Sequence, residues 1–395
     1  MARLETITGK AISGEWGDDD RFGTGIPVLR TTNFTNDGVL NFTNVVTRTI
    51  TKKNVSDKYL RSGDIIIEKS GGSDKQPVGR VVYYSGKPDT YLFNNFTGVL
   101  RVIDSSCWDS KYLFYALYAN YLKGGTRKYQ NQTTGLHNLK TDQYIKEFEV
   151  PEYSIQEQKQ IAVIFDKISR LIVLRKQQLA KLDELVKSRF IELFGVPGAK
   201  SDQWPRMSLG DCCILNPKKN LDTRLVPELN VSFIPMSAVS EDGDMEVSET
   251  RKYEDVKTGF TYFADNDILF AKITPCMENG KGAIARKLIN GIGFGSTEFH
   301  VLRPIQNKSN PYWLYVMTAL ESFRTSAKAN MTGSAGQKRV PASYLESYQV
   351  SLPPMELQEQ FASFVKQTNQ SKPVIRQSLD QLETLKKSLM QEYFA

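Results

Sequence analysis

The stretch RSGDIIIEKSGG, Arg61 to Gly72, places an aspartate before three isoleucines and closes the run with an acidic residue and a lysine. A second phrase, ADNDILFAKITP (Ala264 to Pro275), has the same order of Asp, three apolar residues, one variable residue and Lys. Its aspartate and its lysine each stand 203 residues after their counterparts in the first phrase. Self-similarity at one long interval indicates that the chain contains an internal repeat.

Further landmarks keep the same order along the chain, with offsets between 200 and 205 residues. Small differences in offset are expected where loops differ in length. The sequence therefore predicts a tandem duplication of a unit of about 200 residues. The landmarks are residues 26–40 with 231–245, Gly79 with Gly282, Arg101 with Arg303, residues 111–117 with 311–317, and Gln156-Glu157-Gln158 with Gln358-Glu359-Gln360.

The first part of each unit is predicted to be a mixed α/β globule. DIIIEK, GRVVYY and TGVLRV are short β-branched or aromatic runs between turn residues, which is typical of strands. SKYLFYALYANYL (110–122) predicts a helix. The phrase NGIGFGS (290–296) has alternating glycines, but no predicted helix follows, so we expect a hairpin rather than a dinucleotide-binding loop.

The second part of each unit is predicted to be one long helix. Residues 155–194 contain no Pro or Gly, and their apolar residues recur by fours and threes, as in a coiled coil. Residues 355–393 have a similar, poorer pattern, in which Pro373 is expected to kink or restart the helix. Because an isolated apolar stripe would be exposed, we expect the helices to pair antiparallel, related by a pseudo-two-fold axis. Their seam comprises Ile161, Phe165, Ile168, Ile172, Leu179, Leu182 and Val186 in the first helix and Phe361, Val365, Ile375, Leu379 and Leu382 in the second.

These patterns divide the chain into four expected segments. Residues 1–152 and 196–353 would form the two globules, and residues 153–195 and 354–395 would form the central and C-terminal helices.

Composition excludes several classes of protein. No run of about 18 apolar residues is present, and the N-terminus lacks the apolar core of a signal peptide, so we expect a cytoplasmic protein without membrane contact. The four cysteines have no C-x-x-C spacing, and the two histidines are too few for a zinc site, so neither a metal nor another cofactor is expected. A net charge of +7 favours a polyanionic partner.

The local motifs give little support for a catalytic site. A nuclease site needs carboxylates that converge on a metal, but Glu68 and Lys69 are adjacent and would point to opposite faces of a strand. The second copy has Ala271 where Glu68 stands. The phrase NPYW (310–313) lacks the second proline of the amino-methyltransferase motif, and no P-loop is found.

If the polyanionic partner is a nucleic acid, two polar, glycine-containing loops are the best candidates for binding it. They lie at equivalent places in the two units, at 123–140 and 327–340, and carry the forked donors and amides that read base edges, with lysines suited to phosphates. Weaker candidates flank the repeated Asp phrase. The candidates are Lys123, Arg127, Lys128, Gln130, Asn131, Asn138, Lys140, Lys69, Lys75, Gln76 and Arg80 in the first unit, and Lys328, Asn330, Gln337, Lys338, Arg339, Lys272, Lys281 and Arg286 in the second.

The whole chain resembles the DNA-specificity (S) subunits of type I restriction-modification systems. The resemblance rests on a turn with Pro followed by a Glu-Gln opening to a long helix, seen twice in VPEYSIQEQKQIAVIFDKI and LPPMELQEQFASFVKQ. It implies that each globule is a target recognition domain that reads half of a split, asymmetric site in double-stranded DNA. It also implies that the helices separate the domains and bind two methyltransferase subunits through the seam residues, with restriction subunits in the full complex.

In this reading the chain is not itself an enzyme. Two alternatives stay open at this point: a single-chain nuclease or methyltransferase with two DNA-binding arms, and a coiled-coil scaffold without a DNA role.

Overall fold

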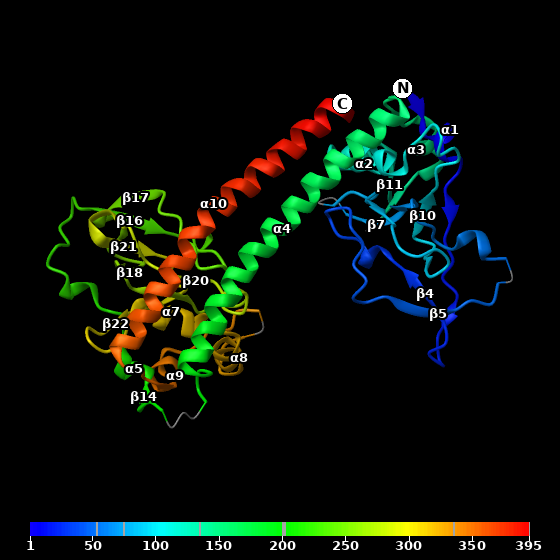
Figure 1. Cartoon of the computed structure of the whole chain (residues 1–395). Coiled ribbons are helices and arrows are strands. Elements are labelled where there is room, and N and C mark those ends of the chain that lie inside the picture. The colour runs from blue at the N-terminus through cyan, green and yellow to red at the C-terminus, as the bar shows by residue number, and fades with distance from the viewer. Residues whose placement is uncertain (53, 74–75, 134–135, 200–202, 335, 395) are drawn as a thin grey trace. The chain divides into compact units, whose positions relative to one another are not determined.

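The computed structural model describes the chain except for residues 53, 74–75, 134–135, 200–202, 335 and 395. Residues 1–174 and 378–395 form one compact unit, and residues 175–377 form a second. Each unit consists of a globule and one segment from each of two long helices, α4 (Ile155–Phe194) and α10 (Met355–Phe394) (Figure 1).

The first globule is a mixed α/β fold built around one buried sheet. This sheet has the strand order β2-β10-β6-β8, and a second sheet has the order β3-β5-β4-β9. Helix α2 (Ser110–Leu122) covers the first sheet beside β8, and Asp109 caps its N-terminus. The strands are β1 (Ala2–Arg3), β2 (Ile12–Ser13), β3 (Asp18–Asp19), β4 (Ile26–Leu29), β5 (Val46–Thr49), β6 (Ile65–Glu68), β7 (Ser70–Gly72), β8 (Val81–Tyr83), β9 (Leu92–Phe93), β10 (Thr97–Leu100), β11 (Gln130–Thr133), β12 (Leu136–Leu139) and β13 (Glu149–Val150), with the short helices α1 (Leu4–Thr8) and α3 (Thr141–Glu147).

The second globule repeats this plan. Its sheet β15-β22-β19-β20 corresponds strand for strand to β2-β10-β6-β8, and its second sheet has the order β17-β16-β21-β18. The helix equivalent to α2 is α7 (Pro311–Ala319), which Asn310 caps. The remaining elements are β14 (Arg206–Ser208), α5 (Leu209–Cys212), β15 (Cys213–Leu215), β16 (Asn230–Ile234), β17 (Glu249–Lys252), α6 (Tyr253–Val256), β18 (Thr261–Ala264), β19 (Ile268–Ala271), β20 (Gly282–Ile284), β21 (Ile292–Gly295), β22 (Phe299–Pro304), α8 (Glu321–Ala329), α9 (Ala342–Ser347) and β23 (Gln349–Ser351).

One buried ion pair explains why the Asp phrase occurs twice. Asp64, just before β6, accepts two hydrogen bonds of 2.7 Å from the guanidinium of Arg101. Asp267, just before β19, accepts bonds of 2.8 and 2.6 Å from Arg303. Both aspartates are buried, and each also accepts from a backbone N–H of the preceding turn. The phrase is therefore architectural: it ties the start of one central strand to the end of its neighbour.

The two long helices pair antiparallel within each unit. In the first unit, Phe165 of α4 packs against Phe394 of α10, with ring centroids 5.7 Å apart. In the second unit, Phe190 packs against Phe361 at 5.5 Å, and two turns of α4 earlier Asp183 binds Lys372. The expected seam residues are buried or half-buried, so the predicted coiled-coil packing is confirmed.

Two local expectations need correction, the first of them only for the restart of the helix. Helix α10 continues through Pro373 without a restart, and Pro373 is exposed on the helix surface. NGIGFGS is not a hairpin: after a 3-10 turn it forms β21, which pairs in parallel with β16 and antiparallel with β18. The glycines are needed because the bulky ring of Phe263 lies against Gly293, where an added Cβ would come within 2.2 Å of it.

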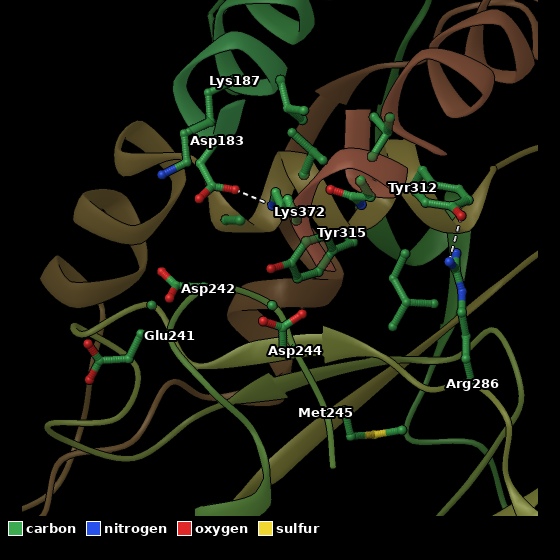
Figure 2. Close-up of a pocket in the computed structure, with 18 of the residues that line it drawn as sticks. Asp183, Lys187, Glu241, Asp242, Asp244, Met245, Arg286, Tyr312, Tyr315 and Lys372 are labelled. Carbon is green, nitrogen blue, oxygen red and sulfur yellow. Dashed lines mark hydrogen bonds and ion pairs between the residues drawn. The ribbon is translucent and has the colours of Figure 1, made fainter. Parts of the chain in front are cut away.

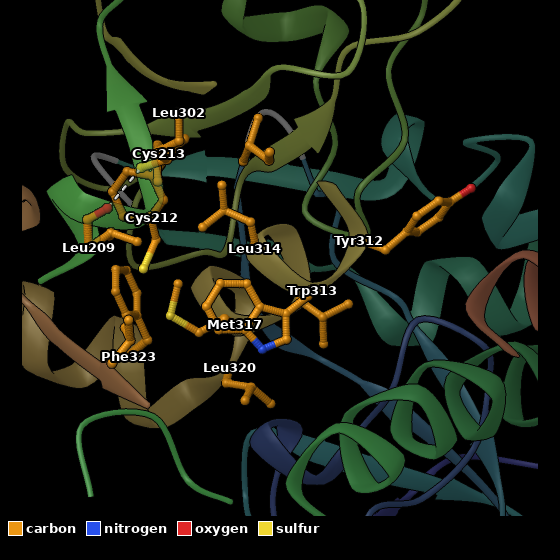
Figure 3. Packing of buried hydrophobic residues seen from close by; sticks show 14 of the residues in the cluster. Leu209, Cys212, Cys213, Leu302, Tyr312, Trp313, Leu314, Met317, Leu320 and Phe323 are labelled. Atoms are coloured by element: carbon orange, nitrogen blue, oxygen red, sulfur yellow. Dashed lines mark hydrogen bonds between the residues drawn. The ribbon is translucent and has the colours of Figure 1, made fainter. Parts of the chain in front are cut away.

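The core of the second unit lies between α7 and the central sheet. Trp313, Leu314 and Met317 of α7 face Cys212 and Cys213 in this core (Figure 3). None of the helices in the described part of the chain is long and apolar enough to cross a membrane.

Candidate nucleic-acid interface

The first unit brings the 123–140 loop beside the end of β6. Strands β11 and β12 form a hairpin, and β12 pairs with β7, so that Asn138 lies opposite Ser70. The backbone N–H of Leu139 donates to the carbonyl of Lys69 at 2.8 Å. Two candidate segments that are far apart in sequence thus form one surface.

Lys69 lines an open pocket on this surface. The pocket has a volume of about 480 Å³ and is lined by Lys69, Ser13, Asn95, Asn138 and Asp142, among others. Lys69 is half-buried, and this burial lowers the pKa of its ammonium group. A cation that has lost part of its hydration in this way is well placed to bind an anion or a base edge.

The remaining candidates of the first unit differ in what they contact. Gln76 donates to Asn36 at 2.9 Å, and Lys123 donates to the carbonyl of Phe394 at 3.1 Å, near the end of α10. The Lys128 ammonium lies 4.8 Å from the ring of Tyr129. Lys75 lies outside the described residues. The side chains of Arg127, Lys128, Asn131, Asn138 and Lys140 are exposed, and that of Gln130 bonds His137.

Arg80 is engaged within the globule. Its Nε and Nη2 donate to the Glu68 carboxylate at 3.0 and 2.8 Å, and the Glu68 side chain is only 2% exposed. This contact raises the pKa of the Arg80 guanidinium. Glu68 is therefore a structural counter-ion and not a free catalytic carboxylate.

The second unit repeats the arrangement around Lys272. Its backbone N–H donates to the Glu298 carbonyl and its carbonyl accepts from Val340, both at 2.9 Å. In the first unit, Lys69 has the same two contacts, to Phe96 and from Leu139, each at 2.8 Å. Burial lowers the pKa of Lys272, as it does that of Lys69. The equivalent lysine thus meets the equivalent loop in both copies.

The loop of the second unit is built differently from the hairpin of the first. Helix α8 leads into a turn in which Arg339 forms isolated bridges with Ile273 and Thr332. The side chains of Lys328, Asn330, Gln337 and Lys338 are exposed, whereas Arg339 is bound to Glu298. Two globules with one framework therefore present different side chains.

Arg286 and Lys281 have hydrogen-bond partners outside the loop at 327–340 and away from Lys272. Arg286 donates to the Tyr312 hydroxyl at 2.5 Å, in a pocket of about 790 Å³ between the globule and the segments of α4 and α10 in the same unit (Figure 2). Lys281 donates to the Met236 carbonyl at 3.3 Å. The lining of this pocket has acidic and basic side chains together, including Asp244 and the Asp183–Lys372 pair. It does not include Lys272 or Arg339.

Sequence reasoning missed the acidic partners of these cations. Glu298 stands 41 residues before Arg339, and Glu68 stands 12 residues before Arg80. No local pattern links such positions, because the contacts arise from strand pairing. Among the described residues, no group of three or more His, Cys, Asp and Glu side chains is arranged to hold a metal ion.

Five of the seam residues that were expected to bind partner subunits lie in the chain's own cores. Ile161 and Phe165 belong to the core of the first unit, and Val186, Phe361 and Val365 belong to that of the second. A different row of apolar side chains is exposed on α4. It comprises Val163, Ile164, Leu171 and Leu174.

Comparisons with known proteins agree with the repeat. A family model described as the type I restriction modification DNA specificity domain matches residues 4–184 and again 201–384. The chain is 44% identical over 160 residues to the type I restriction enzyme EcoAI specificity subunit of Escherichia coli, covering 40% of this chain and 26% of that protein. It is 40% identical over 153 residues to the EcoEI specificity subunit of Escherichia coli, covering 38% of this chain and 25% of that protein. The matches thus span about a quarter of the length of these relatives.

The same fold occurs in a solved structure. The crystal structure of a type I restriction-modification system S subunit from M. genitalium aligns over 100% of this chain and 95% of its own, with a TM-score of 0.52 and 15% identity. At this identity the likeness concerns the fold alone. The family model, in contrast, covers most of the sequence in two copies, so the chain belongs to the family of type I restriction-modification DNA specificity domains.

Proposed function

We propose that this chain is the sequence-specific DNA-binding subunit of a type I restriction-modification complex, and that it has no catalytic activity of its own. The observation that carries the proposal is the repeated meeting of a half-buried lysine, Lys69 or Lys272, with a polar loop at the end of the same central strand. If the equivalent surfaces of the two units both bind DNA, we expect them to share this framework and to differ in the loop.

Each globule would read one half of a bipartite target. The paired strands β11 and β12 and the segment after α8 carry different donors, so we expect two different half-sites and an asymmetric target. In the first unit Lys69, Gln76, Arg127, Lys128 and Asn138 are proposed contacts. In the second unit Lys272, Lys328, Asn330, Lys338 and Arg339 are proposed contacts. Arg80 and Arg286 would affect DNA binding only indirectly, by stabilising the fold of their globules, since each is bound within its own globule.

The proposed partners are double-stranded DNA, two methyltransferase subunits and, in the full complex, restriction subunits. The seam of α4 and α10 is occupied by the chain itself. We therefore assign the methyltransferase contact to the exposed row on α4, where Ile164 and Leu171 are one heptad apart and Leu174 follows three residues later.

The functional segments would be the recognition domains 1–152 and 196–353 and the helices 153–195 and 354–395. Since the proposed ligand is DNA, we place the protein in the cytoplasm.

Exchange of one globule tests the proposal. Residues 2–150 are replaced by the same segment of a relative, and the methylated motif of the host genome is sequenced with each version and without the gene. We expect one half-site to change and the other to stay. If both halves change together, or if deletion of the gene leaves the methylated motif in place, the proposal is wrong. Binding of S-adenosylmethionine by the purified chain alone would favour the single-chain enzyme instead.

A further inference from the structure

Arg339 is held along one edge of its guanidinium by Glu298. Its Nε donates to the two carboxylate oxygens at 2.9 and 3.2 Å, and its Nη2 donates to Oε1 at 2.8 Å. Its Nη1 donates to the carbonyl of Gln337 at 3.1 Å. The contact with Arg339 lowers the pKa of Glu298, which keeps the carboxylate charged.

This arrangement leaves a defined part of the guanidinium available. An arginine has five N–H groups in a planar fork, and the contacts above use one on each nitrogen. Within the described part of the chain, one N–H on Nη1 and one on Nη2 have no acceptor. The Arg339 side chain is 41% exposed, so these two donors can meet a ligand from solvent.

The backbone on both sides of the pair is fixed. Arg339 and Thr332 exchange two backbone hydrogen bonds, of 2.8 and 2.9 Å. The Glu298 carbonyl accepts from the N–H of Lys272 at 2.9 Å. The carboxylate, the guanidinium and the Lys272 ammonium therefore form one cluster at the end of β19, where Glu298 and Arg339 both act on the pKa of Lys272.

We infer that Glu298 is a positioning residue that orients Arg339 to donate two parallel hydrogen bonds to a bidentate acceptor. Within the proposed function, on which this inference rests, the acceptor is the O6 and N7 edge of a guanine in the half-site read by the second unit. Two phosphate oxygens offer similar chemistry but carry no sequence information. A guanidinium that is already held loses less freedom on binding than a free arginine, which favours discrimination between bases.

The first unit supplies an internal comparison. Glu68 holds the same edge of Arg80, but that arginine side chain is only 15% exposed, and its Nη2 also reaches the Thr31 carbonyl at 3.4 Å. The Glu68–Arg80 pair is thus enclosed in its globule. The exposure of the arginine therefore distinguishes the Glu298–Arg339 pair, which can contact a ligand, from the structural Glu68–Arg80 pair, although both pairs share the same hydrogen bonds.

The experiment uses the full chain with its methyltransferase subunits. Glu298→Gln replaces one carboxylate oxygen with an NH₂ group that repels the guanidinium, and Arg339→Lys keeps the charge but removes the fork. Glu346→Gln, on the exposed surface of α9, is the control for loss of one negative charge. Binding is measured on duplexes with each base substituted in turn, over a range of salt concentrations, and thermal melting checks the fold.

We expect both Glu298→Gln and Arg339→Lys to reduce the preference for guanine at one position of one half-site by about ten-fold or more, while Glu346→Gln leaves it unchanged. The other half-site should be read as before. Unchanged base preference in both variants overturns the inference, and so does a uniform loss of affinity with a smaller salt slope, which would assign Arg339 to phosphate. If Glu298→Gln does not fold, the base preference of Arg339→Lys alone tests whether Arg339 reads the guanine. A wild-type complex without sequence preference would instead refute the proposed function.

Discussion

The side chains of Gln158 and Gln358 make the same three hydrogen bonds, one in each unit. Gln158 accepts from the N–H of Asp109 at 2.9 Å and donates to the carbonyls of Cys107 and Tyr153 at 3.0 and 2.9 Å. Gln358 accepts from Asn310 at 2.8 Å and donates to Lys308 and Pro353 at 3.0 and 2.8 Å. Each amide thus joins the start of a long helix to the capped start of α2 or α7.

This relationship corrects the register of the repeat at its most prominent motif. Alignment of the two Gln-Glu-Gln triplets pairs Gln156 with Gln358, but the hydrogen bonds pair Gln158 with Gln358. The equivalent phrases are therefore Gln158-Lys-Gln-Ile-Ala and Gln358-Glu-Gln-Phe-Ala. The match of identical triplets was coincidental, because only one glutamine of each triplet is buried.

Gln158→Ala and Gln358→Ala should each lower the free energy of unfolding of the chain by about 2 to 4 kcal/mol. Each change removes the partner of a part-buried N–H and of two carbonyl groups, and an unsatisfied group costs about 1 to 3 kcal/mol. Urea denaturation measures the effect. Gln160→Ala and Gln360→Ala, at exposed positions one half-turn away, are matched controls and should stay within about 0.5 kcal/mol of the wild type. Equal effects at buried and exposed positions would contradict this role.

Glu68→Gln should destabilise the first unit by about 3 kcal/mol, since it leaves the largely buried Arg80 guanidinium without its counter-ion. Thermal and chemical unfolding report the loss. Glu149→Gln, at an exposed position of the same globule, serves as the control. A nuclease role for Glu68 would predict the opposite pattern, with stability kept and a cleavage activity lost.

Arg127→Ala should weaken binding of the proposed DNA target by about 1 to 3 kcal/mol if its exposed side chain reads a base. Lys338→Ala should instead lower affinity for all sequences and reduce the salt slope by about one. Titrations with target and scrambled duplexes at several salt concentrations separate the two effects. If neither variant changes affinity or slope, the DNA surface lies outside these loops.

The thiols should differ in reactivity. Burial raises the pKa of Cys212 to about 11 and that of Cys213 to about 12, so both remain protonated near neutral pH and are shielded in the core. Cys107 is exposed. Iodoacetamide at pH 8 should therefore modify Cys107 in the folded protein and reach the two core cysteines only after unfolding, because the thiolate is the reacting form. Mass spectrometry of digests locates the label. Rapid labelling of Cys212 in the folded chain would contradict the packing.

Local patterns in the sequence determined the repeat, the strands around DIIIEK and the limits of the long helices. Helical and strand periodicity depend on neighbouring residues, so 155–194 could be predicted as one helix without knowledge of its partner. The seam on α4 followed for the same reason: a heptad stripe must be covered. Pro373 shows the limit of local rules, since packing on both sides carries α10 through it.

Tertiary structure alone decided which charged and polar side chains are engaged and which face solvent. Arg80, Arg286 and Arg339 are all candidate DNA contacts in the sequence, yet the first is enclosed by Glu68 and the second bonds Tyr312. Arg339 keeps part of its fork exposed beside Glu298. The reason is physical: a charge in a globule must find a counter-charge or acceptor when it loses water, and the residue that supplies it is chosen by strand pairing between distant segments. The sequence lists the donors, but only the folded chain determines which of them remain available to a ligand.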